Sequence, residues 1–273
     1  MNRFTLLCLV SVLVLFTSCN TDPKAAGRRY VENGKKYFER GKTKQASIMF
    51  RRALQKDPRN AEGWYRLGLV NLTESNLSEA RRDFQRSSAL LEAPTPKTGT
   101  PATPETNKSS ASQADAVNPP LTPHDPIWID ALSKLGDIDY FAHTTNTGVP
   151  EFARELKNVA AKLLADDPKS YNGLRLEGYC ALVLLQESYK VPGEKGIKLA
   201  QEGLDTAISK FRTANAAKPY QPEVVSMLVK LLFVAKKDQE AEKLGRELID
   251  KQKTYNQMYD ILYLQFLRAN RSQ

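Results

Sequence analysis

Two stretches of the chain repeat one another at a spacing of 34 residues, and this period constrains the fold more than any other sequence feature. Writing residues 27–60 above residues 61–94 aligns an aromatic residue, a glycine, an alanine and a phenylalanine. The aligned pairs are Tyr30 with Trp64, Gly34 with Gly68, Ala46 with Ala80, and Phe50 with Phe84. A period of this length is typical of stacked helical hairpins, each of which needs its neighbour to bury its apolar face.

The same positions carry a family resemblance. The residues that carry it are Tyr30, Gly34, Tyr37, Ala46, Phe50, Ala53 and Pro58 in the first copy, and Trp64, Leu67, Gly68, Ala80 and Phe84 in the second. This pattern resembles the tetratricopeptide repeat (TPR). Gly34 and Ala46 are small where two helices cross, and Pro58 ends the second helix. In the second copy, Asn71 replaces an aromatic residue and Ser87 a small apolar one.

The resemblance implies an all-α solenoid, a right-handed superhelix whose first helices line a concave groove for peptides or protein segments. The expected groove positions are Arg28, Val31, Lys35 and Phe38 in the first unit, and Glu62, Tyr65, Leu69 and Leu72 in the second. They mix basic and apolar character. They do not reproduce the Lys/Asn clamp with which some family members hold a C-terminal carboxylate.

Helical spacing returns after residue 124. Ala207, Phe211, Ala214 and Pro219 have the same mutual spacing as Ala46, Phe50, Ala53 and Pro58. We therefore expect divergent TPR-like helical pairs over 125–273, ending in a lone helix over Tyr255–Arg268. The pair over 125–168 is expected to lack the glycine of the repeat.

A different composition separates these regions. Residues 94–123 contain seven prolines and few large apolar side chains. Such a segment buries too little surface to offset its ordering entropy, so residues 92–124 are predicted to be a linker or a disordered insertion.

The N-terminus predicts export. Residues 1–18 have one basic residue and then an uncharged apolar run too short to span a membrane, which is typical of a signal peptide. The ending Phe16-Thr17-Ser18-Cys19 resembles the bacterial lipobox, with Phe16 in place of the usual Leu. The resemblance implies lipid attachment at Cys19, a tether over 19–26, and a periplasm-facing location on either membrane. The alternative is an ordinary signal peptide with an incidental cysteine.

The excess positive charge is concentrated in the first unit. Residues 24–60 contain 12 Lys and Arg against three Asp and Glu, whereas residues 61–273 are neutral. Anionic lipid headgroups, an acidic partner or an anionic polysaccharide would suit this segment, and a merely solvated basic face stays open. An exported, membrane-tethered protein rarely meets nucleic acid, so no nucleic-acid partner is expected.

No catalytic or metal-binding motif is found in the sequence. His124 and His143 are expected in exposed loops, and Cys180 lies in an apolar helix without a nearby cation to activate it. The Asp166-Asp167 pair precedes Pro168 and is expected to end one helix and cap the next. No cofactor, metal or enzymatic activity is predicted.

These features favour a membrane-anchored protein–protein interaction scaffold of the bacterial envelope, acting in an export or assembly complex for polysaccharide, pili or outer-membrane proteins. The alternative hypothesis is the N-terminal regulatory or substrate-positioning part of a longer enzyme.

Overall fold

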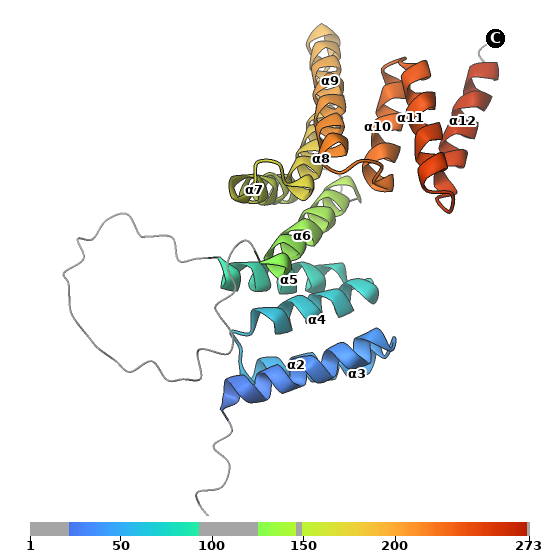
Figure 1. Cartoon of the computed structure of the whole chain (residues 1–273). Helices are drawn as coiled ribbons and strands as arrows, with labels where there is room; N and C mark the ends of the chain where they lie inside the picture. Colours follow the sequence, from blue (N-terminus) through green and yellow to red (C-terminus); the bar gives the residue numbers. More distant parts are fainter. Residues whose placement is uncertain (1–21, 93–124, 146–148, 272–273) are drawn as a thin grey trace, which may run out of the picture. The chain divides into compact units, whose positions relative to one another are not determined.

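The computed structural model describes residues 22–92, 125–145 and 149–271, and every regular element within these ranges is an α-helix (Figure 1). The all-helical prediction is confirmed. The chain divides into two compact units, one up to Leu91 and one from Glu92 onward. The predicted signal peptide, Cys19 and nearly all of the predicted linker lie outside the described residues. No described helix is long and apolar enough to cross a membrane.

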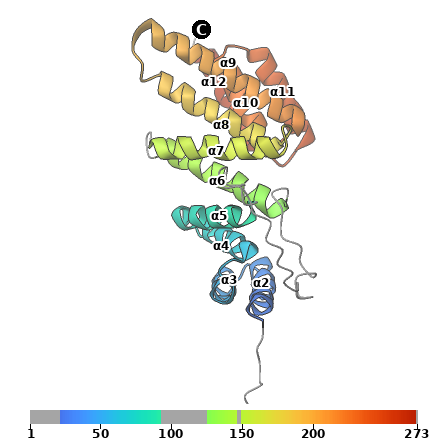
Figure 2. The ribbon, with the colours of Figure 1, turned by 90° about the vertical axis from the view of Figure 1, so that its left-hand side faces the viewer.

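Unit 1 consists of two helical hairpins. Its helices are α2 (Pro23–Glu39), α3 (Thr43–Lys56), α4 (Ala61–Thr73) and α5 (Leu77–Leu91). Asp22 caps α2 by accepting a hydrogen bond from the Lys24 amide at 3.0 Å, and Asn60 caps α4 by accepting one from the Gly63 amide at 2.7 Å. Gly41 turns the chain between α2 and α3 with a φ of +70°, which favours glycine. Figure 2 shows α2 beside α3 and α4 beside α5.

Each hairpin closes around a glycine and a phenylalanine. A Cβ atom added to Gly68 would lie 2.8 Å from Cε1 of Phe84, and one added to Gly34 would meet the ring of Phe50. Both phenylalanine rings are fully buried. The glycines therefore allow the two helices of each hairpin to approach closely enough to enclose the ring.

The departures from the repeat pattern in α4 and α5 are compensated by buried hydrogen bonds. Asn71 Nδ2 donates to Oδ2 of Asp83 at 2.7 Å, and Ser87 Oγ donates to the Ala61 carbonyl at 2.9 Å. Because each buried polar atom has a partner, these substitutions keep the packing of the hairpin.

Unit 2 contains three hairpins and a further helix. Its helices are α6 (Pro126–Thr145), α7 (Pro150–Asp166), α8 (Tyr171–Ser188), α9 (Gly193–Ala217), α10 (Pro222–Val234), α11 (Asp238–Lys251) and α12 (Gln257–Arg271). The pair α8 and α9 repeats the closure seen in unit 1, because a Cβ on Gly178 would lie 2.7 Å from Cε1 of Phe211. The prediction that the pair α6 and α7 lacks a glycine is wrong, because Gly136 lies in α6. The atoms nearest to a Cβ on Gly136 belong to Leu176 of α8 and not to a residue of α7.

The prediction of an exposed loop around His143 is wrong. Helix α6 continues to Thr145, and His143 is only 2% exposed. Its Nδ1 lies 3.4 Å from the Val149 carbonyl oxygen. The hydroxyls of Thr144 and Thr145 donate back to the Phe141 carbonyl at 2.9 and 2.8 Å, which explains how a threonine-rich segment remains helical. His124 lies outside the described residues.

The closure of the first hairpin can be tested with Gly34→Ala. The added methyl group would overlap the buried Phe50 ring, so we expect a loss of about 1–3 kcal/mol of unfolding free energy, despite alanine's higher helix propensity. Asn33→Ala, at the exposed neighbouring position, is the control and should stay within about 0.5 kcal/mol. Chemical denaturation measures both. Equal stability of Gly34→Ala and the unchanged protein would contradict the close-packing explanation.

Candidate functional site

The predicted groove residues of unit 1 lie on α2 and α4 and differ in exposure. Arg28, Lys35, Phe38, Glu62, Leu69 and Leu72 are partly exposed. Val31 and Tyr65 are 1% and 9% exposed. Val31 belongs to the same core cluster as Phe50, so it contributes to the packing of the hairpin and offers no groove surface.

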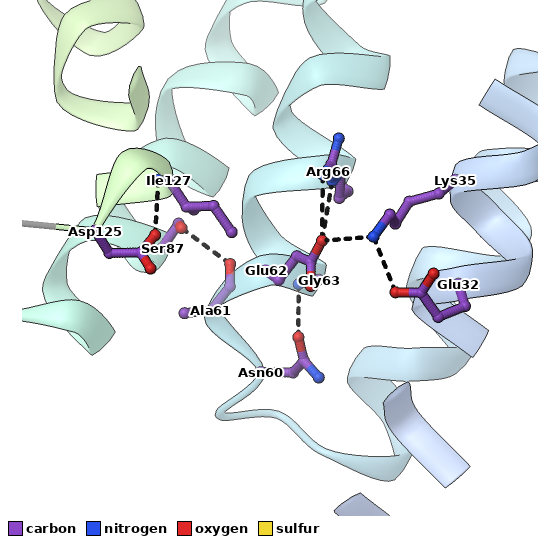
Figure 3. A network of polar contacts seen from close by, with 10 residues as sticks. All are labelled: Glu32, Lys35, Asn60, Ala61, Glu62, Gly63, Arg66, Ser87, Asp125 and Ile127. Carbon is purple, nitrogen blue, oxygen red and sulfur yellow. Dashed lines mark hydrogen bonds and ion pairs between the residues drawn. The ribbon is translucent and has the colours of Figure 1, made fainter. Parts of the chain in front are cut away.

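A chain of ion pairs links α2 to α4 at this surface (Figure 3). Lys35 Nζ lies 2.9 Å from Oε1 of Glu32 and 3.4 Å from Oε1 of Glu62. Arg66 Nη2 lies 3.3 Å from the same Glu62 oxygen. The hydrogen bond to Glu32 and the charges of both glutamates raise the pKa of Lys35 against the opposing effect of burial. The side chains of Lys35 and Arg66 are therefore already paired within the protein.

Aromatic and aliphatic side chains also lie on this predicted groove face, some buried in the core and some partly exposed. The Tyr65 ring centroid lies 6.0 Å from that of Phe84, and the Arg66 guanidinium lies 5.4 Å above the Tyr65 ring. Tyr65 thus contributes mainly to the core. Phe38 of α2 and Leu69 of α4 remain as partly exposed apolar side chains on the predicted groove face.

Apart from the predicted groove, unit 1 has a hollow among α3, α4 and α5. Arg51 and Asp83 are two of the residues that line it. Trp64 is held there by donating its Nε1 hydrogen to the Pro58 carbonyl at 2.9 Å, and the Arg86 guanidinium stacks 4.5 Å above its ring. Asp83 is 5% exposed. Burial raises the pKa of Asp83 from 3.8 to about 6, although the hydrogen bond from Asn71 acts in the opposite direction.

In unit 2, Arg175 of α8 connects the first helices of three hairpins, α6, α8 and α10. Its guanidinium pairs with Asp137 of α6, and its Nη2 also donates to the Ser133 hydroxyl at 2.9 Å. Its Nε lies 3.5 Å from Oε1 of Glu223 on α10. Arg175 is 3% exposed, so its charge is buried, whereas the side chains of Asp137 and Glu223 are 45% and 54% exposed. A ligand would therefore meet the carboxylates before the arginine.

The electrostatics of this cluster keep the arginine charged. Burial is the largest single effect and lowers the pKa of Arg175, but the charge and hydrogen bond of Asp137, with smaller contributions from Tyr179 and Glu223, together place the pKa above its ordinary value. Burial, followed by hydrogen bonding to Glu223, raises the pKa of Tyr171, whose hydroxyl donates to Glu223 at 2.7 Å. The Arg175 guanidinium and the Tyr171 hydroxyl therefore both keep their protons at neutral pH.

Aromatic rings support the cluster from one side. The rings of Tyr140 and Tyr179 stack with centroids 4.3 Å apart, and Phe211 meets Tyr179 edge-on at 5.8 Å. Burial raises the pKa of Tyr140 to about 12. Tyr179 and Glu223 also line a hollow of about 410 Å³, together with Ser226, Met227, Lys230, Tyr255 and Gln257. In this hollow, Ser226 Oγ lies 3.0 Å from the Tyr255 hydroxyl. This hollow offers rings, hydroxyls and charges of both signs to a polypeptide segment.

In the part of the chain that the structure describes, the candidate reactive side chains form no catalytic arrangement. Burial raises the pKa of Cys180 to about 11, so its thiol is protonated at neutral pH and is a poor nucleophile. Among the described residues, no group of His, Cys, Asp and Glu could hold a metal ion.

Comparison with known proteins explains this architecture. The model of the TPR repeat family matches residues 34–73. Solved TPR structures align over far more of the chain. The protein has the tetratricopeptide-repeat fold. A thermophilic TPR protein of Thermus thermophilus shares 15% identity at a TM-score of 0.52, covering 89% of this chain and 100% of that one.

Two further structures show the same TPR fold. MamA of Desulfovibrio magneticus RS-1 has 12% identity and a TM-score of 0.51, covering 85% of this chain and 97% of its own. PilF of Pseudomonas aeruginosa has 18% identity and a TM-score of 0.50, covering 92% and 95%. Among curated proteins, no sequence matches. TPR folds are generally non-catalytic interaction scaffolds, and the repeat binds peptide or protein segments.

The sequence did not predict the cluster around Arg175, although the position of Arg175 in its repeat corresponds to a predicted groove position in the first repeat. Arg175 and Tyr179 stand three residues before and one residue after Gly178. Val31 and Lys35 have the same offsets from Gly34 in the first repeat. Extending the predicted groove positions from Gly34 to Gly178 would therefore have identified both residues, but not their partners Asp137 and Glu223.

The role of Arg175 in unit 2 can be tested with Arg175→Met. Removing a buried cation would leave two carboxylates facing an apolar side chain. Because both carboxylates are about half exposed, we expect a loss of about 1–3 kcal/mol, below the range for fully buried pairs. Arg246→Met removes an exposed pair with Glu242 and should cost less than about 1 kcal/mol. Denaturant titration compares them, and equal losses would contradict the central role of Arg175.

The buried carboxylate of Asp83 predicts a pH-dependent stability. Its pKa is raised in the folded state, so the stability it confers is fully present below pH 3.8 and is lost as the pH rises through about 6. We expect Asp83→Asn to stabilise the protein at pH 7.5, by at most about 3 kcal/mol. The gain should shrink toward pH 4, as followed by thermal unfolding. A gain that does not depend on pH would show that the charge of Asp83 is not its cause.

Proposed function

We propose that this protein is a lipid-anchored interaction scaffold of the bacterial cell envelope, which holds segments of partner proteins along the first helices of its repeats. The observation that carries this proposal is the set of partly exposed side chains that the first helices present outside their hairpin cores, on α2 and α4 in unit 1 and on α6, α8 and α10 in unit 2. A TPR fold whose first helices offer such side chains is suited to hold an extended polypeptide.

The partner-binding surface differs between the units. In unit 1 it combines Phe38, Leu69 and Leu72 with the Lys35–Glu62 ion pair. In unit 2 it combines aromatic rings with the exposed carboxylates of Asp137 and Glu223. Partner segments with alternating apolar and polar side chains suit both surfaces, which is compatible with an export or assembly complex for polysaccharide, pili or outer-membrane proteins.

The anchor is proposed from the sequence before the first helix. Cys19 follows an apolar leader, and α2 begins only four residues later, at Pro23. Acyl chains on Cys19 would attach the repeats to a membrane facing the periplasm, and two or more chains hold a protein firmly.

Site-specific photocrosslinking tests the partner-binding surface. A photoreactive residue placed at Leu69 or Met227 should yield discrete crosslinked protein species in intact cells. The same residue at Gln85 or Lys243, on the second helices α5 and α11, is the matched control and should yield none of them. The same species from all four positions would contradict binding on the first helices.

Metabolic labelling tests the anchor separately. With radiolabelled palmitate in the growth medium, the unchanged protein should be labelled and sediment with membranes. We expect Cys19→Ala to lose the label and to leave the membrane pellet after a high-salt wash. A labelled Cys19→Ala protein would rule out lipid attachment at Cys19.

A further inference from the structure

The outer face of α3 carries charge that no role in the partner-binding groove explains. Helix α3 contains four basic residues, Lys44, Arg51, Arg52 and Lys56, and no Asp or Glu. All four side chains are exposed, and none forms an ion pair with another described residue. The charges of Lys44, Arg52 and Lys56 are therefore available to an external anion, whereas that of Arg51 also acts on Asp83.

The cations are arranged on one side of the helix. Lys44, Ile48, Arg51, Arg52 and Gln55 follow one another at spacings of three, four or one residues, which places them on a single face. We call this face the basic stripe. The opposite face is buried in the hairpin through Ala46, Phe50 and Ala53. Ile48, near the middle of the stripe, is 50% exposed.

The corresponding second helices of unit 2, α9 and α11, contain Asp and Glu as well as Lys and Arg, and some of their cations are paired. Lys210 and Arg212 of α9 pair with Glu177 and Glu240, and Arg246 of α11 pairs with Glu242. Helix α3 contains no Asp or Glu, and the acidic group that the charge of its Arg51 influences is Asp83 of α5. Its purely basic composition is thus a local property of the first hairpin and does not follow from the repeat fold.

We propose that the basic stripe docks on anionic lipid headgroups. Its cations lie in a row on an exposed helix face, which suits a fluid array of headgroups better than a single acidic ligand. The exposed side chain of Ile48 can enter the interfacial region between headgroups, as apolar residues of amphipathic surface helices do.

The position of the stripe in the chain supports this occupant, and here the inference rests on the proposed anchor at Cys19. The four residues from Cys19 to Pro23 can span at most about 14 Å. An acylated Cys19 would therefore hold the start of α2 within about 14 Å of the membrane surface. Because attraction is largely screened beyond a Debye length of about 8 Å, the cations of the hairpin would act by direct contact with the headgroups. A tether this short makes the headgroups the nearest large source of negative charge.

Vesicle binding by an unacylated protein tests the stripe independently of the anchor. The chain from Asn20 to Gln273 contains every described residue but lacks Cys19. We expect it to sediment with vesicles of phosphatidylcholine and phosphatidylglycerol, not with phosphatidylcholine alone, and to be released by salt. Lys44→Gln/Arg52→Gln should lower the partition coefficient roughly 25-fold, at about fivefold for each cation. Arg51 is left unchanged because it also lines the hollow above Asp83.

The control variant is Lys195→Gln/Lys243→Gln, which removes the same charge from exposed positions in unit 2. It should bind the anionic vesicles like the unchanged chain, and circular dichroism should show both variants folded. An equal loss in the control, or no binding to anionic vesicles, would overturn the proposal. Binding to soluble polyglutamate without binding to vesicles would also overturn it, in favour of an acidic protein partner. Because the tested chain lacks Cys19, none of these results depends on palmitate labelling or groove crosslinking.

Discussion

The close approach of two helices over a glycine is the contact on which the rest of the structure depends. Gly34, Gly68 and Gly178 each leave room for a buried phenylalanine ring from the paired helix. In the three hairpins built in this way, the first and second helices have different roles. The first helices present the proposed partner-binding surface, whereas the second helices complete the core and expose an outer face. Any residue larger than glycine at these positions would separate the helices and open the core.

Polar side chains extend this packing between neighbouring hairpins. In unit 1, Lys35 and Glu62 connect α2 to α4, and in unit 2, Arg175 connects α6, α8 and α10. These links lie on the first helices, next to the proposed partner-binding surfaces. They pair Lys35, Arg66 and Arg175 with carboxylates. The proposed groove therefore presents charges of both signs, whereas the basic stripe on α3 presents positive charge without Asp or Glu in its own helix.

Much of the candidate site could be predicted from the 34-residue period, because a repeated register assigns each position of a hairpin to the core or to the surface. The period located Lys35, Phe38, Leu69 and Leu72 on partly exposed positions. It placed Val31 on the same face, yet Val31 is buried, because register alone does not tell how deeply a side chain sits beside a neighbouring hairpin. The Arg175 cluster was missed for a related reason. Its partners lie 38 and 48 residues away, in hairpins whose sequences depart from the repeat.

The sequence by itself determined the helical hairpins, the glycine and phenylalanine positions and the local excess of basic residues. These depend on local spacing and composition, which a linear pattern contains. Only the tertiary structure decided which charges are paired, that Asn71 and Ser87 are satisfied inside the core, and that His143 is buried at the end of α6. Those outcomes depend on distances between side chains far apart in the chain, and such distances exist only after the helices have packed.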